Sequence, residues 1–147
     1  MADFGEYLPY SEDALFFDGT DGRHWHNKYP EKWAELNWQA LVETNKVGEC
    51  FYFSRAGWNG MRKHSTSAWA GDQNVDYSYG DGLPTTIPAA LSLGASGFGI
   101  THFDIGGYTG FLPLKRTRDL FHRSAEAAIF TPVMRTHEGN QPGTPTG

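Results

Sequence analysis

The sequence predicts an α/β fold in which parallel strands are joined by helices. Short apolar runs, typical of buried strands, alternate with segments of helical spacing along the 147 residues. A charged residue stands close to a glycine where three of these runs end, in segments 54–57, 70–72 and 103–107. This alternation favours parallel strands connected by right-handed crossovers.

Within this class, the sequence predicts part of a TIM barrel, the (β/α)8 fold. Charged residues at the C-terminal ends of the strands suit that fold, because its active sites are built on that face. A barrel of eight units takes roughly 250 residues, so we expect the C-terminal part of a barrel, about four to five βα units. A doubly wound sheet is the alternative, although no Gly-rich phosphate-binding motif follows a first strand. We expect one partial-barrel domain at 1–140 and a flexible tail at 141–147.

The elements follow from the local sequence. Helices are expected at 30–44, 86–93 and 115–129. Pro30 and Pro88 lie in the first turns of the first two, where proline needs no backbone donor. Strands are expected at 49–54, 66–70, 97–103 and 132–136. The stretch 11–28 reads as a loop, and Cys50, the single cysteine, is expected to be buried and cannot form an intramolecular disulfide.

Composition excludes several functional classes. The net charge of −5, without a basic cluster, argues against nucleic-acid binding. No apolar segment approaches the roughly 18 residues of a membrane helix, and no signal pattern opens the chain. His24 and His26 have no third ligand at a recognisable spacing, so neither a metal nor another cofactor is expected. The lack of disulfides is consistent with a cytoplasmic protein, and the oligomeric state is left open.

Two carboxylates are the candidates for chemistry. Asp72 follows the Ala70–Gly71 step after an expected strand, and Asp3 lies near the start of the chain. With the expected strand order, both lie on one rim of the barrel, and a facing carboxylate pair is what acid-catalysed glycoside cleavage uses. The alternative is that Asp3 is a solvated terminal residue and Asp72 a turn residue.

Five further residues are candidates for sugar contacts. Arg55 could hold a hydroxyl or a carboxylate through its fork of donors, or form only an ion pair. Asp104 could bind hydroxyls or cap its loop, and His137 could bind hydroxyls or fill the core. Trp69 and Tyr108 could stack on a sugar ring or pack in the interior.

Five motifs, at 1–6, 55–57, 69–72, 104–107 and 134–137, occur in the order used by glycoside hydrolase family thirty-one. The chain resembles this family from residue 1 to about residue 143. The resemblance implies a TIM barrel and a retaining mechanism, with Asp3 as nucleophile and Asp72 as acid/base. It also implies the following roles in sugar binding: Arg55, Asp104 and His137 on hydroxyls, Trp69 as a pocket wall, and Tyr108 near a sulfonate.

Within the family, segments 2–9, 69–76 and 134–140 resemble bacterial sulfoquinovosidases. The resemblance implies a carbohydrate substrate, an α-sulfoquinovosyl glycerol or diacylglycerol glycoside. An α-glucosidase and a catalytically incomplete half-barrel binding module are the alternatives. In sulfoquinovosidases, the Arg and Trp that grip the sulfonate precede the nucleophile, so the chain resembles an internal fragment. We therefore expect the isolated chain to be inactive and to self-associate.

Overall fold

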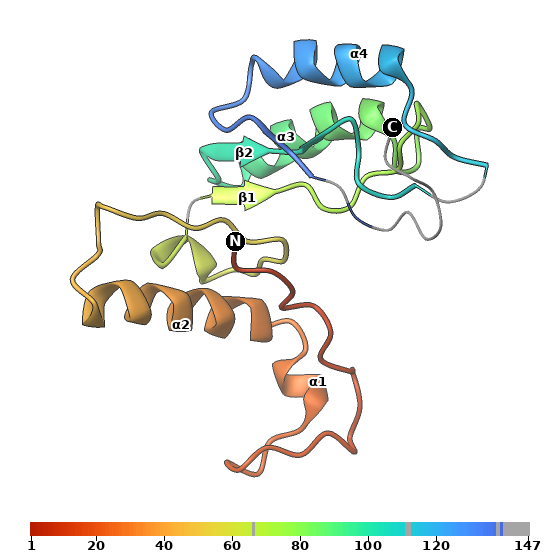
Figure 1. Cartoon of the computed structure of the whole chain (residues 1–147). Helices are drawn as coiled ribbons and strands as arrows, with labels where there is room; N and C mark the ends of the chain where they lie inside the picture. Colours follow the sequence, from red (N-terminus) through yellow and green to blue (C-terminus); the bar gives the residue numbers. More distant parts are fainter. Residues whose placement is uncertain (66, 111–112, 138, 140–147) are drawn as a thin grey trace. The chain divides into compact units, whose positions relative to one another are not determined.

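The structure is a computed structural model that describes residues 1–65, 67–110, 113–137 and 139, traced in Figure 1. The chain divides into two compact units, Met1–Ala68 and the residues from Trp69 onward. The predicted tail at 141–147 lies outside the described residues.

The described residues of the first unit, 1–65 and 67–68, form three helical segments and extended chain. The helix α1 (Gly22–Trp25) begins at Asp21, whose carboxylate accepts the first backbone N–H groups. The long helix α2 (Tyr29–Glu43) has Pro30 in its first turn and contacts the 3-10 helix η1 (Met61–Lys63). Isolated parallel bridges join Ala2 to Ser54 and Ser54 to Ala68.

The second unit begins at the end of β1 (Ser67–Trp69), and Ala70 donates its N–H to the His102 carbonyl at 3.0 Å. Two further strands, β3 (Asp104–Ile105) and β4 (Arg135–Thr136), pair in parallel with Asp104 opposite Arg135. The remaining elements are η2 (Leu83–Thr85), α3 (Thr86–Ala95), β2 (Ile100–His102) and α4 (Arg118–Ala128).

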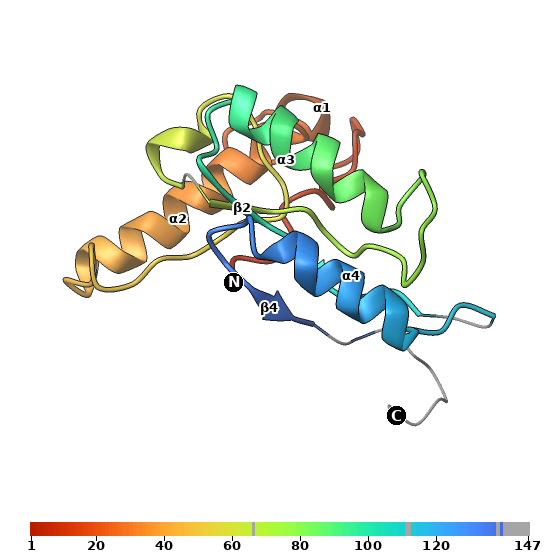
Figure 2. The ribbon, with the colours of Figure 1, turned by 90° about the horizontal axis from the view of Figure 1, so that it is seen from above.

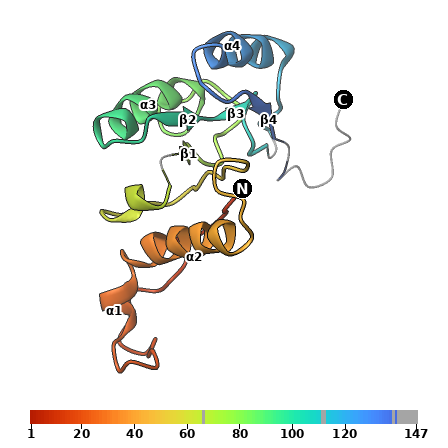
Figure 3. The ribbon, with the colours of Figure 1, turned by 90° about the vertical axis from the view of Figure 1, so that its left-hand side faces the viewer.

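The helices of the second unit cover its strands. Contacts join α3 to β2 and α4 to β3, and Figure 2 shows α4 running beside β4. Figure 3 shows β3 and β4 close to α4, with α3 beside β2. Phe103, Ile105 and Ala128 form the buried cluster between β3 and α4. These contacts fix the turn after β3, which carries candidate site residues.

Most expected elements are confirmed and some boundaries change. The three predicted helices correspond to α2, α3 and α4, and α4 starts at Arg118 because the Thr117 hydroxyl accepts the N–H of Leu120. The expected loop at 11–28 contains α1. The parallel pairing of β3 with β4 confirms parallel strands at that point.

The predicted strand at 49–54 is wrong, as is the burial of Cys50. Within 49–54, isolated bridges form only at Cys50 and Ser54, and Cys50 is exposed. The Lys46 carbonyl accepts the N–H groups of both Glu49 and Cys50, so the chain turns there instead of extending. The apolar character of this run predicted a buried strand. The turn at Lys46, just after α2, instead leaves Cys50 exposed.

Candidate active site

The first unit places Arg55 between two carboxylates. Its Nη1 lies 3.3 Å from Asp3 Oδ1 and its Nη2 lies 2.5 Å from Glu6 Oε1. The Arg55 side chain is only 13% exposed, so the ion pairs are partly shielded from water. Asp3 Oδ1 also accepts the N–H of Phe4 at 2.9 Å. The Asp3 carboxylate is therefore oriented by two donors.

Two aromatic rings also contact the Arg55 guanidinium. Its central carbon lies 4.9 Å from the Phe4 ring centroid and 5.7 Å from that of Tyr7, within the range of cation–π attraction. Arg55 Nη2 also donates to the Tyr7 hydroxyl at 3.2 Å. The backbone at Phe4 adopts a φ of 66°, which is uncommon for a residue with a side chain.

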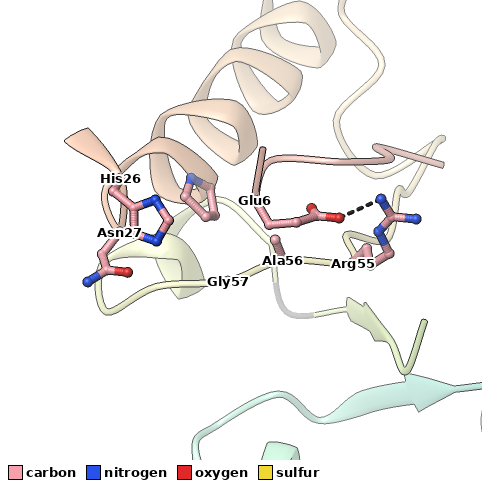
Figure 4. Close-up of a pocket in the computed structure, with 7 residues that line it drawn as sticks. Glu6, His26, Asn27, Arg55, Ala56 and Gly57 are labelled. Atoms are coloured by element: carbon pink, nitrogen blue, oxygen red, sulfur yellow. Dashed lines mark ion pairs between the residues drawn. The ribbon is translucent and has the colours of Figure 1, made fainter. Parts of the chain in front are cut away.

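A cleft of about 390 Å³ opens beside this ion-pair group. Figure 4 shows Glu6 pointing toward Arg55 at one end, with His26 and Asn27 at the other. His26 Nδ1 lies 2.6 Å from the Leu8 carbonyl oxygen, which fixes the imidazole ring. The cleft thus presents a carboxylate, an imidazole and an amide to a polar ligand.

In the second unit, the Asp72 loop is bonded to the chain around Tyr108. The Gln73 carbonyl accepts the N–H groups of Tyr108 and Thr109 at 2.8 and 2.9 Å. The Thr109 hydroxyl donates to the Asp72 carbonyl at 3.0 Å, and Asn74 forms a parallel bridge with Thr109. Asp72 and Tyr108 therefore belong to one hydrogen-bonded assembly.

Asp104 lies at the centre of a buried polar group. Its side chain is 0% exposed, and its Oδ1 accepts the Trp69 indole N–H and pairs with Arg135 Nη2, both at 2.8 Å. Arg135 Nε lies 3.0 Å from His102 Nε2. Burial raises the pKa of Asp104 to about 6, with repulsion from Asp72 acting in the same direction, while Arg135 and the Trp69 hydrogen bond oppose it.

An aromatic cluster contacts this buried polar group and consists of Trp69, Tyr108 and His137. The rings of Tyr108 and His137 stack with centroids 4.6 Å apart and an interplanar angle of 16°. His137 meets the Trp69 ring edge-on at 6.0 Å, and the Arg135 guanidinium lies 5.0 Å from that ring. Such a cluster can present ring faces and polar tips to a sugar.

The predicted site residues are brought together in two groups. Asp3 and Arg55 are in contact in the first unit. In the second unit, Trp69 contacts Asp104 and His137 contacts Tyr108, while Asp72 shares the loop assembly described above. The buried position of Asp104 favours a positioning role, and its direct contact with a sugar stays a prediction. The separation of the Asp3 and Asp72 carboxylates, about 5–5.5 Å for a retaining pair, also stays a prediction.

Several residues in these groups were missed by the sequence analysis. Glu6 and Arg135 lie inside the motifs used above, and an acid or a cation within a motif is a signal that could have identified them. Arg116 is different, because it precedes α4 and only the structure shows that its guanidinium binds three carbonyl oxygens. Its sequence neighbours carry no indication of this.

Among the described residues, the structure shows neither a metal-binding cluster nor a membrane-spanning helix. They contain no group of three or more His, Cys, Asp or Glu side chains placed to hold a metal ion. None of the helices among them is both long and apolar enough to cross a membrane.

Comparison with known proteins shows similarity along nearly the whole chain. The family "Glycosyl hydrolases family 31 TIM-barrel domain" matches residues 2–146. The sulfoquinovosidase of Escherichia coli (strain K12) is 52% identical over 143 residues, which cover 97% of this chain and 21% of that protein. The sulfoquinovosidase of Agrobacterium fabrum is 49% identical over 142 residues, again 97% of this chain and 21% of the relative.

A solved structure is similar over the same extent. The family 31 sulfoquinovosidase from E. rectale, in complex with the aza-sugar inhibitor IFGSQ, has a TM-score of 0.91 and 49% identity. The match covers 99% of this chain and 22% of that one. The chain thus spans about a fifth of the length of these relatives.

Proposed function

The chain belongs to the TIM-barrel domain of glycosyl hydrolases family 31, and from this premise we propose that the full-length protein is a retaining α-glycosidase acting on sulfoquinovosides. The observation that carries this proposal is the identity of about 50% to two sulfoquinovosidases over 97% of the chain. The substrates would be α-sulfoquinovosyl glycerol or diacylglycerol glycosides. We further propose that the chain forms the C-terminal part of the barrel, about four to five βα units.

The proposed reaction uses Asp3 and Asp72 in two steps. Asp72 donates a proton to the leaving oxygen while Asp3 attacks the anomeric carbon, which forms a glycosyl-enzyme and releases the aglycone. Asp72 then removes a proton from water, which attacks the anomeric carbon and frees Asp3. The sugar leaves with the anomeric configuration it had in the substrate.

The contacts of each carboxylate support these roles. Arg55 and the Phe4 N–H orient Asp3, so that the attacking oxygen has a fixed direction. The backbone bonds to the Gln73 carbonyl hold the Asp72 loop against Tyr108. Arg55 and His137 are proposed to bind sugar hydroxyls, Trp69 to form a wall, and Tyr108 to lie near the sulfonate.

The test measures hydrolysis of an aryl α-sulfoquinovoside and the matched aryl α-glucoside by the full-length protein. We expect the sulfoquinovoside to be preferred over the glucoside. We also expect the first sugar product to retain the α configuration, which NMR of its anomeric proton reports. Asp3→Asn should abolish turnover, and Asp72→Ala should lower kcat by roughly 10²–10⁴-fold on substrates whose leaving group needs protonation.

Azide provides the control for these variants. It needs no general base, so it should restore turnover of an activated aryl substrate by Asp72→Ala and yield the α-glycosyl azide, without restoring Asp3→Asn. Preference for the glucoside would instead indicate an α-glucosidase. An inverted first product would contradict the mechanism, and hydrolysis of neither substrate would contradict the proposed function.

A further inference from the structure

Arg116 connects the two chain segments that carry Tyr108 and His137. Its Nε donates to the Gly106 carbonyl at 2.9 Å, and its Nη2 donates to the carbonyls of Gly107 and His137 at 2.5 and 2.9 Å. One planar guanidinium therefore binds the backbone just before Tyr108 and the backbone of His137. The Tyr108 and His137 rings are the stacked pair of the candidate site.

The turn before Tyr108 is shaped to receive this guanidinium. Gly106 and Gly107 have φ values of 83° and 75°, in the left-handed region that favours glycine. A Cβ on Gly106 would come within 2.8 Å of Phe121 Cδ2 and 3.0 Å of Arg116 Cδ and Nε, and one on Gly107 within 2.7 Å of the Asn74 carbonyl oxygen. Both glycines thus permit close approach, Gly106 of Phe121 and Arg116, and Gly107 of the Asp72 loop.

Gly139 also lies close to Tyr108. A Cβ on Gly139 would lie 2.1 Å from two ring carbons of Tyr108, so the backbone at Gly139 contacts that ring. Tyr108 is therefore held through its own turn, by the chain at Gly139 and by stacking on His137. Within the described residues, Arg116 binds both segments at once.

We propose that Arg116 is a positioning residue that sets the Tyr108–His137 stack and, through it, the discrimination between sulfonated and neutral sugars. This inference rests on the proposed function, in which Tyr108 lies near the sulfonate and His137 binds a hydroxyl. Arg116 acts through backbone carbonyls and is not expected to touch the substrate. Three carbonyls at fixed angles require the fork of a guanidinium, and a lysine ammonium cannot reproduce it.

The first test compares Arg116→Lys with the wild type in the full-length protein on the two aryl glycosides. We expect kcat/KM for the sulfoquinovoside to fall roughly 10- to 100-fold, since a small displacement of a binding group has effects of this size. The loss on the neutral glucoside should be smaller, so that the preference narrows. Arg118→Lys is the matched control, because Arg118 is exposed two residues away. Equal losses on both substrates would overturn the role in discrimination.

Chemical rescue separates positioning from general damage to the fold. In Arg116→Ala, guanidinium ion, added far below denaturing concentration, should enter the vacated space and restore part of the sulfoquinovoside activity. Tetramethylammonium, which carries charge but no N–H donors, should restore none. Rescue by both ions, or by neither in a folded variant, would contradict the proposal.

An NMR measurement tests the positioning role of Arg116 without measuring enzyme activity, and so without relying on the proposed reaction. The imidazole of His137 faces the Tyr108 ring, so its carbon-bound protons should be shielded in NMR spectra of protein labelled at histidine. Arg116→Lys should reduce this shielding and Arg118→Lys should leave it unchanged. Wild-type protein inactive on both glycosides would refute the proposed function, whereas unchanged His137 shielding in Arg116→Lys would refute the positioning role.

Discussion

At the scale of single residues, Asp104 shows how burial and charge oppose each other. Its carboxylate is removed from water, which favours the protonated form, while Arg135 and the Trp69 indole favour the ionised form. The desolvation effect is the larger, and the pKa rises from 3.8 to about 6. At neutral pH, Asp104 is therefore ionised and paired with Arg135.

We predict that the Asp104 carboxyl titrates near pH 6 in the folded protein. Between about pH 4 and pH 6, the folded state keeps a proton that the unfolded chain has released, so this group's contribution to stability falls as pH rises through that window. The measurement is carbon NMR of aspartate-labelled protein, with Asp104→Asn to assign the resonance.

Two other aspartates serve as internal controls for this titration. Hydrogen bonds from Thr20 lower the pKa of Asp18, and those from Arg23 lower that of Asp21, so both should titrate below the usual range. An Asp104 resonance that titrates together with these two would contradict the prediction.

At the scale of elements, the turn after β3 depends on α4. The Ser124 hydroxyl, which is buried on α4, accepts the N–H of Gly106 at 2.7 Å. This bond, the carbonyl contacts of Arg116 and the bonds from Tyr108 and Thr109 to Gln73 together fix the turn. A helix behind the sheet thus determines where a candidate site residue lies.

Ser124→Ala should loosen this turn without removing the fold. It leaves a buried N–H without its acceptor, which costs about 1–3 kcal/mol, so amide exchange of segment 104–108 should accelerate by roughly tenfold or more. Hydrogen–deuterium exchange measured by mass spectrometry reports this directly. Ser92→Ala, on the exposed side of α3, is the matched control. Unchanged exchange in segment 104–108 of Ser124→Ala would contradict the role of this bond.

At the scale of the whole molecule, the 147-residue chain exposes many large apolar side chains. Phe17 and Phe130 are 104% and 90% exposed, and Leu15 and Leu91 exceed 70%. Exposed apolar surface favours association with another chain.

We therefore predict that the 147-residue chain, expressed alone, self-associates and hydrolyses no glycoside. Sedimentation over a concentration series should show a rising average mass, and Phe130→Gln with Leu91→Gln should lower it. The full-length protein is the control for activity. A monomer at all concentrations, or measurable turnover by the chain alone, would contradict this prediction.

Much of the local structure follows from sequence signals. The first-turn prolines Pro30 and Pro88 mark α2 and α3, and the Asp104–Gly107 motif marks a turn whose positive φ values favour glycine. Residues 49–54 were wrongly predicted as a strand because their apolar character resembles a buried strand, while the turn at Lys46 leaves Cys50 in solvent. Such turns depend on hydrogen bonds that composition does not reveal.

The sequence by itself determined the helices α2, α3 and α4, the α/β class and the motifs that identify the family, because each depends on residues close together in the chain. Tertiary structure alone showed that Arg55 lies between Asp3 and Glu6. It also showed that the buried Asp104 carboxylate accepts the indole N–H of Trp69. It also showed Arg116 bonded to the backbone of both stacked residues. These are contacts between residues distant in sequence, and their geometry arises only when helices and strands pack together.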